Sequence, residues 1–143
     1  MAKKMNYFES NIQKFGQDFL DFKRTEEIQR DCKFIFRDMV FGNINYEKHG
    51  MYFMEPRFLE QLIIQSEIES RKHAIMFSAL SEYNLNHGDN LSVQLACIEQ
   101  DMYMITSTIY NQLRLVKANN YDISYLTYLP ALLKDHRKTM KNY

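Results

Sequence analysis

The sequence predicts an all-α fold, a small helical bundle of about five helices with one β-hairpin inserted over residues 43–55. Apolar residues recur at spacings of three and four through several segments, which is the period of one helical face. The chain has 143 residues, of which 45% are hydrophobic, so it is long enough to bury one core. It contains no internal repeat and no low-complexity linker. We therefore expect a single helical domain over residues 1–143.

Two amphipathic helices are expected at the N-terminal end. The first covers residues 6–23, where a stripe of apolar side chains has helical spacing: Phe8, Ile12, Phe15, Phe19 and Phe22. The second begins at Thr25, which suits an N-cap, and Glu26 and Glu27 follow in the first turn, where acids favour the positive end of the helix dipole. Gly42 stands where a helix C-terminus favours positive φ, so this helix should end there.

The segment 43–55 is the predicted exception to helical structure. Ile44 and Tyr46 alternate with polar residues, and Gly50 can supply the positive φ of a short turn. A second strand would follow over residues 51–54. Because a lone two-stranded hairpin is marginally stable in water, we expect it to rest on the bundle or on another molecule.

Two long helices should follow, and a shorter one should end the chain. The third helix begins at Pro56, which suits the first helical position, and runs to about Asn84. Its predicted inner face contains Leu59, Leu62, Ile63, Ser66, Ser70, His73, Met76, Phe77 and Leu80. The fourth is capped by Asp89 or Asn90 and carries a bundle seam of Leu91, Leu95, Ile98, Met102, Ile105, Ile109, Leu113 and Val116. The last helix begins near Pro130.

Charge and hydropathy argue against a nucleic-acid or membrane partner. The chain has 18 basic and 18 acidic residues, which sum to zero, whereas nucleic-acid binders are strongly basic. No apolar run is long enough to cross a bilayer. The C-terminal tail does concentrate cations that could grip phosphates: Lys134, Arg137, Lys138 and Lys141. Since cations also favour the negative end of a helix dipole, we prefer to interpret this tail as a solvated helix end.

Glu69 and His73 form the one pair with metal-ligand spacing. Residues four apart share a helix face, as paired ligands must. A metal site needs three or four ligands, however, and only Glu99 or Asp101 on the next helix could complete this one. The favoured alternative is a hydrogen-bonded polar layer between apolar layers, which sets helix register. We therefore predict no metal and no cofactor.

Motifs for catalysis are also missing. The sequence has no Gly-x-Ser-x-Gly elbow and no glycine-rich phosphate loop, and it contains four glycines in all. Cys32 and Cys97 stand far apart with no Cys-x-x-Cys spacing, so we expect both to be small buried residues. These absences predict that the protein is not an enzyme.

Three features favour protein contacts. The fourth helix has a long run without charge in which Tyr103, Met104 and Tyr110 lie off the seam, either in a central helix or at an interface. The hairpin would expose an apolar patch of Met51, Tyr52, Phe53 and Met54. Residues 73–113 contain acids but no Lys or Arg, whereas residues 114–143 are basic, so copies could associate head to tail.

By elimination, the sequence favours a structural subunit of a multi-copy assembly, with homo-oligomeric and other protein contacts. The most specific hypothesis is a neck, adaptor or ring protein, that is, a head–tail connector component, of a tailed-phage particle. It rests on size, on helices with an inserted hairpin, on charge asymmetry and on a composition favouring AT-rich codons. The alternatives are a small soluble regulator or inhibitor of one host protein and, less favoured, a metal-binding helical protein. We expect cytoplasmic synthesis without a signal peptide and, under the phage hypothesis, a place in the virion.

Overall fold

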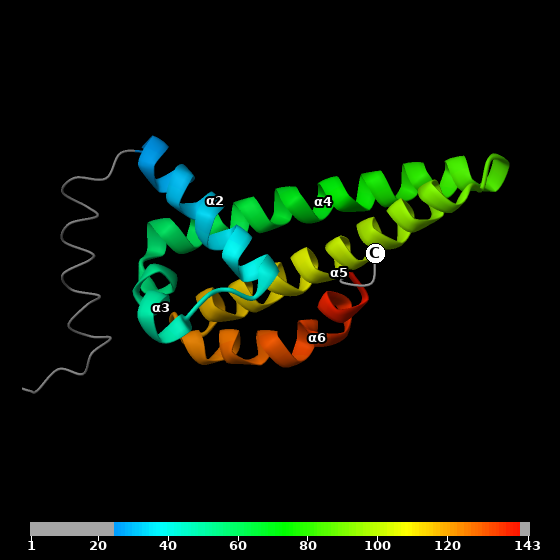
Figure 1. Cartoon of the computed structure of the whole chain (residues 1–143). Helices are drawn as coiled ribbons and strands as arrows, with labels where there is room; N and C mark the ends of the chain where they lie inside the picture. The colour runs from blue at the N-terminus through cyan, green and yellow to red at the C-terminus, as the bar shows by residue number, and fades with distance from the viewer. Residues whose placement is uncertain (1–24, 141–143) are drawn as a thin grey trace, which may run out of the picture.

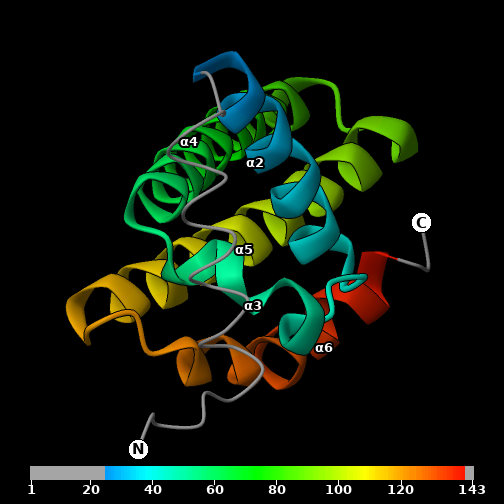
Figure 2. The ribbon, with the colours of Figure 1, turned by 90° about the vertical axis from the view of Figure 1, so that its left-hand side faces the viewer.

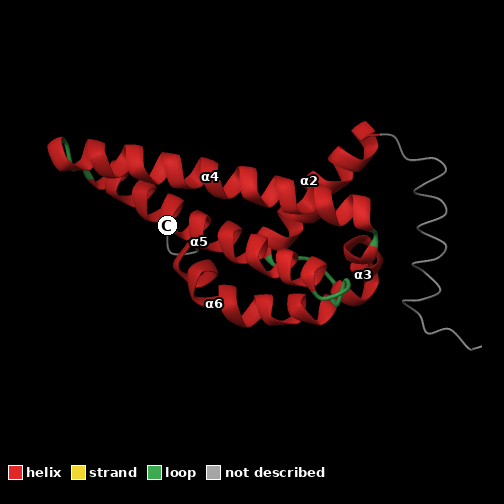
Figure 3. Ribbon diagram, turned by 180° about the vertical axis from the view of Figure 1, so that it is seen from behind, coloured by secondary structure: helices red, strands yellow, loops and turns green. Residues whose placement is uncertain are grey.

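The computed structural model describes residues 25–140, in which five α-helices, one 3₁₀ helix and no strand are found (Figure 3). The elements are α2 (Thr25–Phe41), α3 (Tyr46–Met54), α4 (Pro56–Asn86), α5 (Asn90–Ala118), η1 (Ile123–Tyr128) and α6 (Leu129–Met140). The predicted all-α bundle is confirmed over this range. The predicted helix over residues 6–23 lies outside the described residues.

The two longest helices, α4 and α5, form an antiparallel hairpin on which the others pack (Figure 1). Helix α2 crosses the hairpin near its open end, α6 runs beside α5, and α3 closes the same end, as the end-on view shows (Figure 2). The core lies between these elements, and its fully buried large side chains are Met39, Phe53, Phe58, Leu59, Leu62, Ile105, Ile109, Leu113, Leu126, Leu129 and Leu133. The packed core therefore occupies only the half of the hairpin that the other helices cover.

The predicted β-hairpin over residues 43–55 is wrong, because this segment forms α3. Its aromatic side chains pack inward: Phe53 is fully buried, its ring lies 5.7 Å from that of Tyr46, and the Tyr52 ring lies 4.7 Å from that of Phe58. Residues seven apart, such as 46 and 53, share a helix face, so one short helix brings both rings to the core. Burial of aromatic surface outweighs the weak alternation of two residues with polar neighbours.

The predicted helix boundaries agree with the structure at most ends. Glu55 caps α4, its carboxylate accepting a hydrogen bond of 2.7 Å from the Phe58 N–H, and Pro56 follows at the first position. Of the two candidate caps of α5, Asp89 is the one used, accepting from the Ser92 N–H at 2.8 Å. That hydrogen bond lowers the pKa of Asp89. Gly42, after α2, has φ of +76° as expected.

The two cysteines differ in accessibility, which gives a simple test of the core. Cys32 is buried with its Sγ 3.7 Å from the Phe58 carbonyl oxygen, and burial raises the pKa of its thiol to about 12. Cys97 is half-buried. The thiolate is the reactive species. In the native protein, Cys32 should therefore react with a disulfide reagent more than about tenfold more slowly than Cys97.

The assignment of the two thiols is checked with single substitutions. Cys97→Ser should remove the fast phase, and Cys32→Ser should remove the slow one. Unfolding in denaturant should bring both rates together, because both thiols are then solvated. Equal rates in the native protein would show that Cys32 is not in the core.

Candidate functional site

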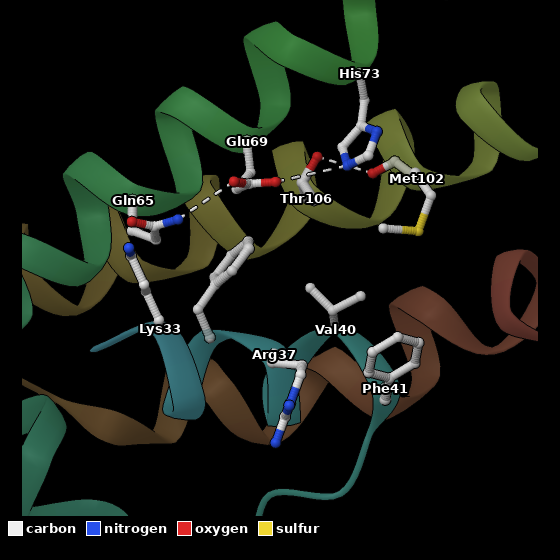
Figure 4. A pocket seen from close by; sticks show the side chains of 10 residues that line it. Lys33, Arg37, Val40, Phe41, Gln65, Glu69, His73, Met102 and Thr106 are labelled. Atoms are coloured by element: carbon white, nitrogen blue, oxygen red, sulfur yellow. Dashed lines mark hydrogen bonds and ion pairs between the residues drawn. The ribbon is translucent and has the colours of Figure 1, made fainter. Parts of the chain in front are cut away.

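A cleft of about 300 Å³ opens where α2 meets the α4–α5 hairpin (Figure 4). It is lined by Lys33, Phe36, Arg37, Val40, Phe41, Gln65, Glu69, His73, Met102 and Thr106. The α2 side of the cleft carries two cationic and several apolar side chains, whereas the hairpin side carries the polar group that the sequence singled out. The predicted pair of Glu69 and His73 thus lies at the surface of a real concavity.

The structure brings Glu99 of α5 to His73 of α4. His73 Nδ1 lies 2.5 Å from Glu99 Oε2, and its Nε2 lies 3.8 Å from Glu69 Oε2. Gln65 donates from its side-chain amide to the other oxygen of Glu69 at 3.3 Å. Asp101, the other candidate partner, instead pairs with His136 of α6 at 3.0 Å. The sequence thus identified Glu99 as a possible partner, and only the fold shows that it, not Asp101, reaches His73.

Within residues 25–140, no group of three His, Cys, Asp or Glu side chains is arranged to hold a metal ion. His73 already uses Nδ1 in a hydrogen bond, and the two carboxylates lie on opposite helices beside it. Neighbouring polar groups also bond locally, Ser66 to the Ile63 carbonyl and Thr106 to the Met102 carbonyl. The cluster therefore fits the polar-layer interpretation, in which it fixes α4 against α5.

Removal of the His73 ring should weaken the junction of α4 and α5. In His73→Ala, Glu99 loses its partner at a site where its side chain is only 20% exposed, so we expect a loss of about 1–3 kcal/mol in the free energy of unfolding. Chemical denaturation followed by circular dichroism measures this. Glu82→Ala, which removes an exposed carboxylate from the same helix, is the matched control and should change stability little. Equal stability of both variants would contradict a structural polar layer.

The basic tail is divided by the fold. Arg137 is directed inward, where Nε donates to the Val40 carbonyl at 3.1 Å and Nη2 donates to the Met39 carbonyl at 2.5 Å. Burial lowers the pKa of its guanidinium. Lys134 and Lys138 are exposed, and Lys141 lies outside the described residues. Arg137 therefore ties α6 to the C-terminus of α2, which leaves a weaker phosphate-binding pattern than the sequence suggested.

The predicted contact residues fall into two groups. In α3, Phe53 is core, and Met51, Tyr52 and Met54 are half-buried, so this segment does not form the exposed patch expected of a hairpin. In α5, Tyr103 and Met104 are exposed. Tyr110 is half-buried and has the Arg114 guanidinium 5.6 Å from its ring centre. Surface available for a partner is thus found on the helices of the α4–α5 pair and not at residues 51–54.

A larger uncovered surface was missed by the sequence reasoning. The part of the hairpin formed by residues 71–104, which we call the arm, extends past α2 and α6 (Figure 1). From residue 71 to the end of α4 no residue is buried, and in the α5 half of the arm only Ser92 and Ala96 are. Large apolar side chains on the arm are exposed: Ile75, Met76, Tyr83, Leu85, Leu91, Val93, Leu95, Tyr103 and Met104.

The α5 seam passes from buried to exposed residues along its length. Ile105, Ile109, Leu113 and Val116 are at most 1% exposed, whereas Leu91 is 66% and Leu95 is 41% exposed in the same register. The spacing of three and four is continuous through both halves. Helix bundles bury a seam of this kind between packed helices. In the described chain, nothing covers it along the arm.

Comparison with protein-family models, with curated proteins and with solved structures finds no match for this chain. None of the helices within residues 25–140 combines the length and the apolar content that a membrane span requires.

Proposed function

We propose that this protein is a non-enzymatic interaction protein, a subunit of a larger assembly, whose α4–α5 arm is its contact surface. The single observation that carries this proposal is the seam of α5, which is buried beside α2 and α6 and exposed at Leu91 and Leu95. Large contiguous apolar patches on a protein surface mark interaction sites. An arm made of two helices can bury only the faces that meet each other, so within residues 25–140 its outer seam stays open to a partner.

The chemistry of the arm supports the same proposal. From Ala74 to Ile98 only Glu82 and Asp89 are charged. Interfaces are depleted of charge at their centre and enriched in aromatic residues and Met, which are represented here by Tyr83 and Met76. The exposed arm therefore has the composition of an interface and not that of a solvated helix pair.

A head–tail connector component of a tailed-phage particle is the more specific form of the proposal. Chain size, an all-helical fold, charge asymmetry and a composition of AT-rich codons support it. The inserted hairpin no longer does, because residues 46–54 are helical. The second candidate is a regulator that binds one host protein, and the same arm would serve it. The arm favours neither by itself, since both need one apolar contact surface.

The test is to introduce a single substitution on the arm in the cells that naturally make this protein. Leu91→Lys should leave the helical content and the melting temperature of the purified chain unchanged but should remove the protein from its native complex, as judged by the sedimentation of extracts. Many copies in that complex would support the assembly subunit, and one copy beside one other protein would support the regulator. Unchanged sedimentation of the variant would overturn the proposal that the arm is the contact surface.

A further inference from the structure

We infer that the partner of the arm is a second copy of this chain, and that two arms pack antiparallel across a two-fold axis to complete a four-helix bundle. This inference rests on the proposed function, because it names the occupant of the same contact surface. Each copy would supply the two helices that the seam of the other lacks. The inference is carried by the register of the apolar face, its area and the charges along the arm.

Helical register groups apolar residues of the arm into one stripe on α4, formed by Met76, Leu80 and Tyr83, and one on α5, formed by Leu91, Leu95 and Ile98. Met76 and Tyr83 follow the buried Leu62 at multiples of seven residues, and the α5 residues continue the seam of Ile105 and Ile109. Both sets therefore face the side of the hairpin on which α2 and α6 cover the core. The arm is a half-completed bundle, and two more helices of matching character would complete it.

The area of this face suits a dimer of the common size. Met76, Tyr83, Leu91 and Leu95 are each between 41% and 66% exposed. With roughly 200 Å² for a large side chain, they offer on the order of 400 Å² of apolar surface. A standard interface takes about 800 Å² from each partner, of which a little over half is apolar. The face therefore supplies about the apolar area that one side of a stable dimer needs.

Charges along the arm favour the antiparallel arrangement. The tip carries Glu82 and Asp89 and no Lys or Arg. The base carries Lys72 and Arg71, of which Arg71 pairs with Glu67, and also Glu99 and Asp101, whose carboxylates pair with His73 and His136. An antiparallel pair places the two tip acids of each copy near Lys72 of the other, whereas a parallel pair would place the tip acids of both copies together. Between tip and base, the arm has no charge to repel a second copy.

The cleft at the base extends the same surface. It lies beside the arm face, and Lys33 and Arg37 line it together with Phe41, which is 58% exposed. Arms that overlap antiparallel along their full length would bring the partner's tip over this cleft. Leu85, which is 85% exposed at the tip, and the two tip acids match the apolar and cationic lining of the cleft.

The experiment is sedimentation equilibrium of the full chain from micromolar to millimolar concentration. The inference predicts a mass of twice 17.2 kDa that dissociates on dilution. Leu91→Glu together with Leu95→Glu should weaken association more than about tenfold, since each copy buries two carboxylates without partners. Leu132→Glu is the matched control, because this leucine is 50% exposed on α6 and off the arm, and it should leave the dimer intact.

A charge exchange tests the orientation. Lys72→Glu should weaken the dimer because the acidic tip then meets an acidic base, and adding Glu82→Lys to the same chain should restore association. Failure of the second change to restore it would overturn the antiparallel arrangement. Removing residues 1–24 is the remaining control, since loss of the dimer only in that variant would place the interface in the N-terminal segment.

The two proposals fail differently. A wild-type chain that is monomeric at every concentration overturns the second-copy inference. If the Leu91→Lys variant is nevertheless absent from the native complex in extracts, the arm is the contact surface for a different protein and the proposed function stands. If the chain is monomeric and Leu91→Lys remains in the complex, both proposals are wrong.

Discussion

Leu113→Ala is expected to destabilise the fold by about 2–5 kcal/mol, because Leu113 is fully buried and its removal leaves a cavity in the core. The same change at Leu91, on the same seam of the same helix, should alter the free energy of unfolding of the monomer by less than about 0.5 kcal/mol. Leu91 is 66% exposed and alanine is the best helix former, so little contact and no helix propensity is lost. The same leucine-to-alanine change at the two positions thus distinguishes the covered half of the seam from the uncovered half.

Urea denaturation at a protein concentration where no association is detected measures both values. The slope of the transition should stay the same in both variants, since neither changes the surface that unfolding exposes. Equal destabilisation by the two changes would mean that an element outside residues 25–140 covers Leu91 in the isolated chain. That result would remove the observation on which the proposed contact surface depends.

Arg137→Met should be the second most damaging substitution, with a loss of about 2–4 kcal/mol. The guanidinium donates to the carbonyls of Val40 and Met39 in the last turn of α2, where the Met39 carbonyl also accepts from the Gly42 N–H at 3.3 Å. A cation at a helix C-terminus also interacts favourably with the helix dipole. Methionine keeps most of the side-chain volume but leaves both carbonyls without this donor. Thermal unfolding followed by circular dichroism measures the loss.

Lys138→Met is the matched control, since it removes an exposed cation next in sequence and should change stability little. A second variant tests the contact itself. At Gly42, where φ is +76°, an added Cβ would lie 2.9 Å from Nη1 of Arg137. Gly42→Ala should therefore be destabilising, and part of its cost should disappear in the double variant with Arg137→Met. If the losses of the two single variants in the free energy of unfolding are strictly additive in the double variant, the guanidinium does not occupy this position.

Periodic apolar residues predicted α2, α4 and α5 because each helix is long enough for its pattern to exclude a strand. The pattern of residues 46–54 is too short to exclude a strand. Nine residues with one glycine fit a short helix or a hairpin equally well, and the choice depended on burial of Phe53 against residues distant in sequence. Local pattern decides long elements, and tertiary burial decides short ones.

The candidate site divides in the same way. Spacing placed Glu69 and His73 on one face, since this follows from helix geometry, but the pairing of His73 with Glu99 needed the register of α4 against α5. The inward turn of Arg137 likewise depended on contacts about 97 residues away in sequence. Exposed leucines of the arm could not be found by pattern, because a buried and an exposed seam have the same period.

The sequence by itself determined that this protein is helical, where its long helices begin and end, and which side chains share a face, because these follow from interactions within one or two turns. Only the tertiary structure decided how far α2 and α6 reach along the α4–α5 hairpin. That reach leaves Leu91 and Leu95 in solvent while Ile109 and Leu113, in the same register, are buried. Burial is a property of which elements meet, and no single helix contains that information.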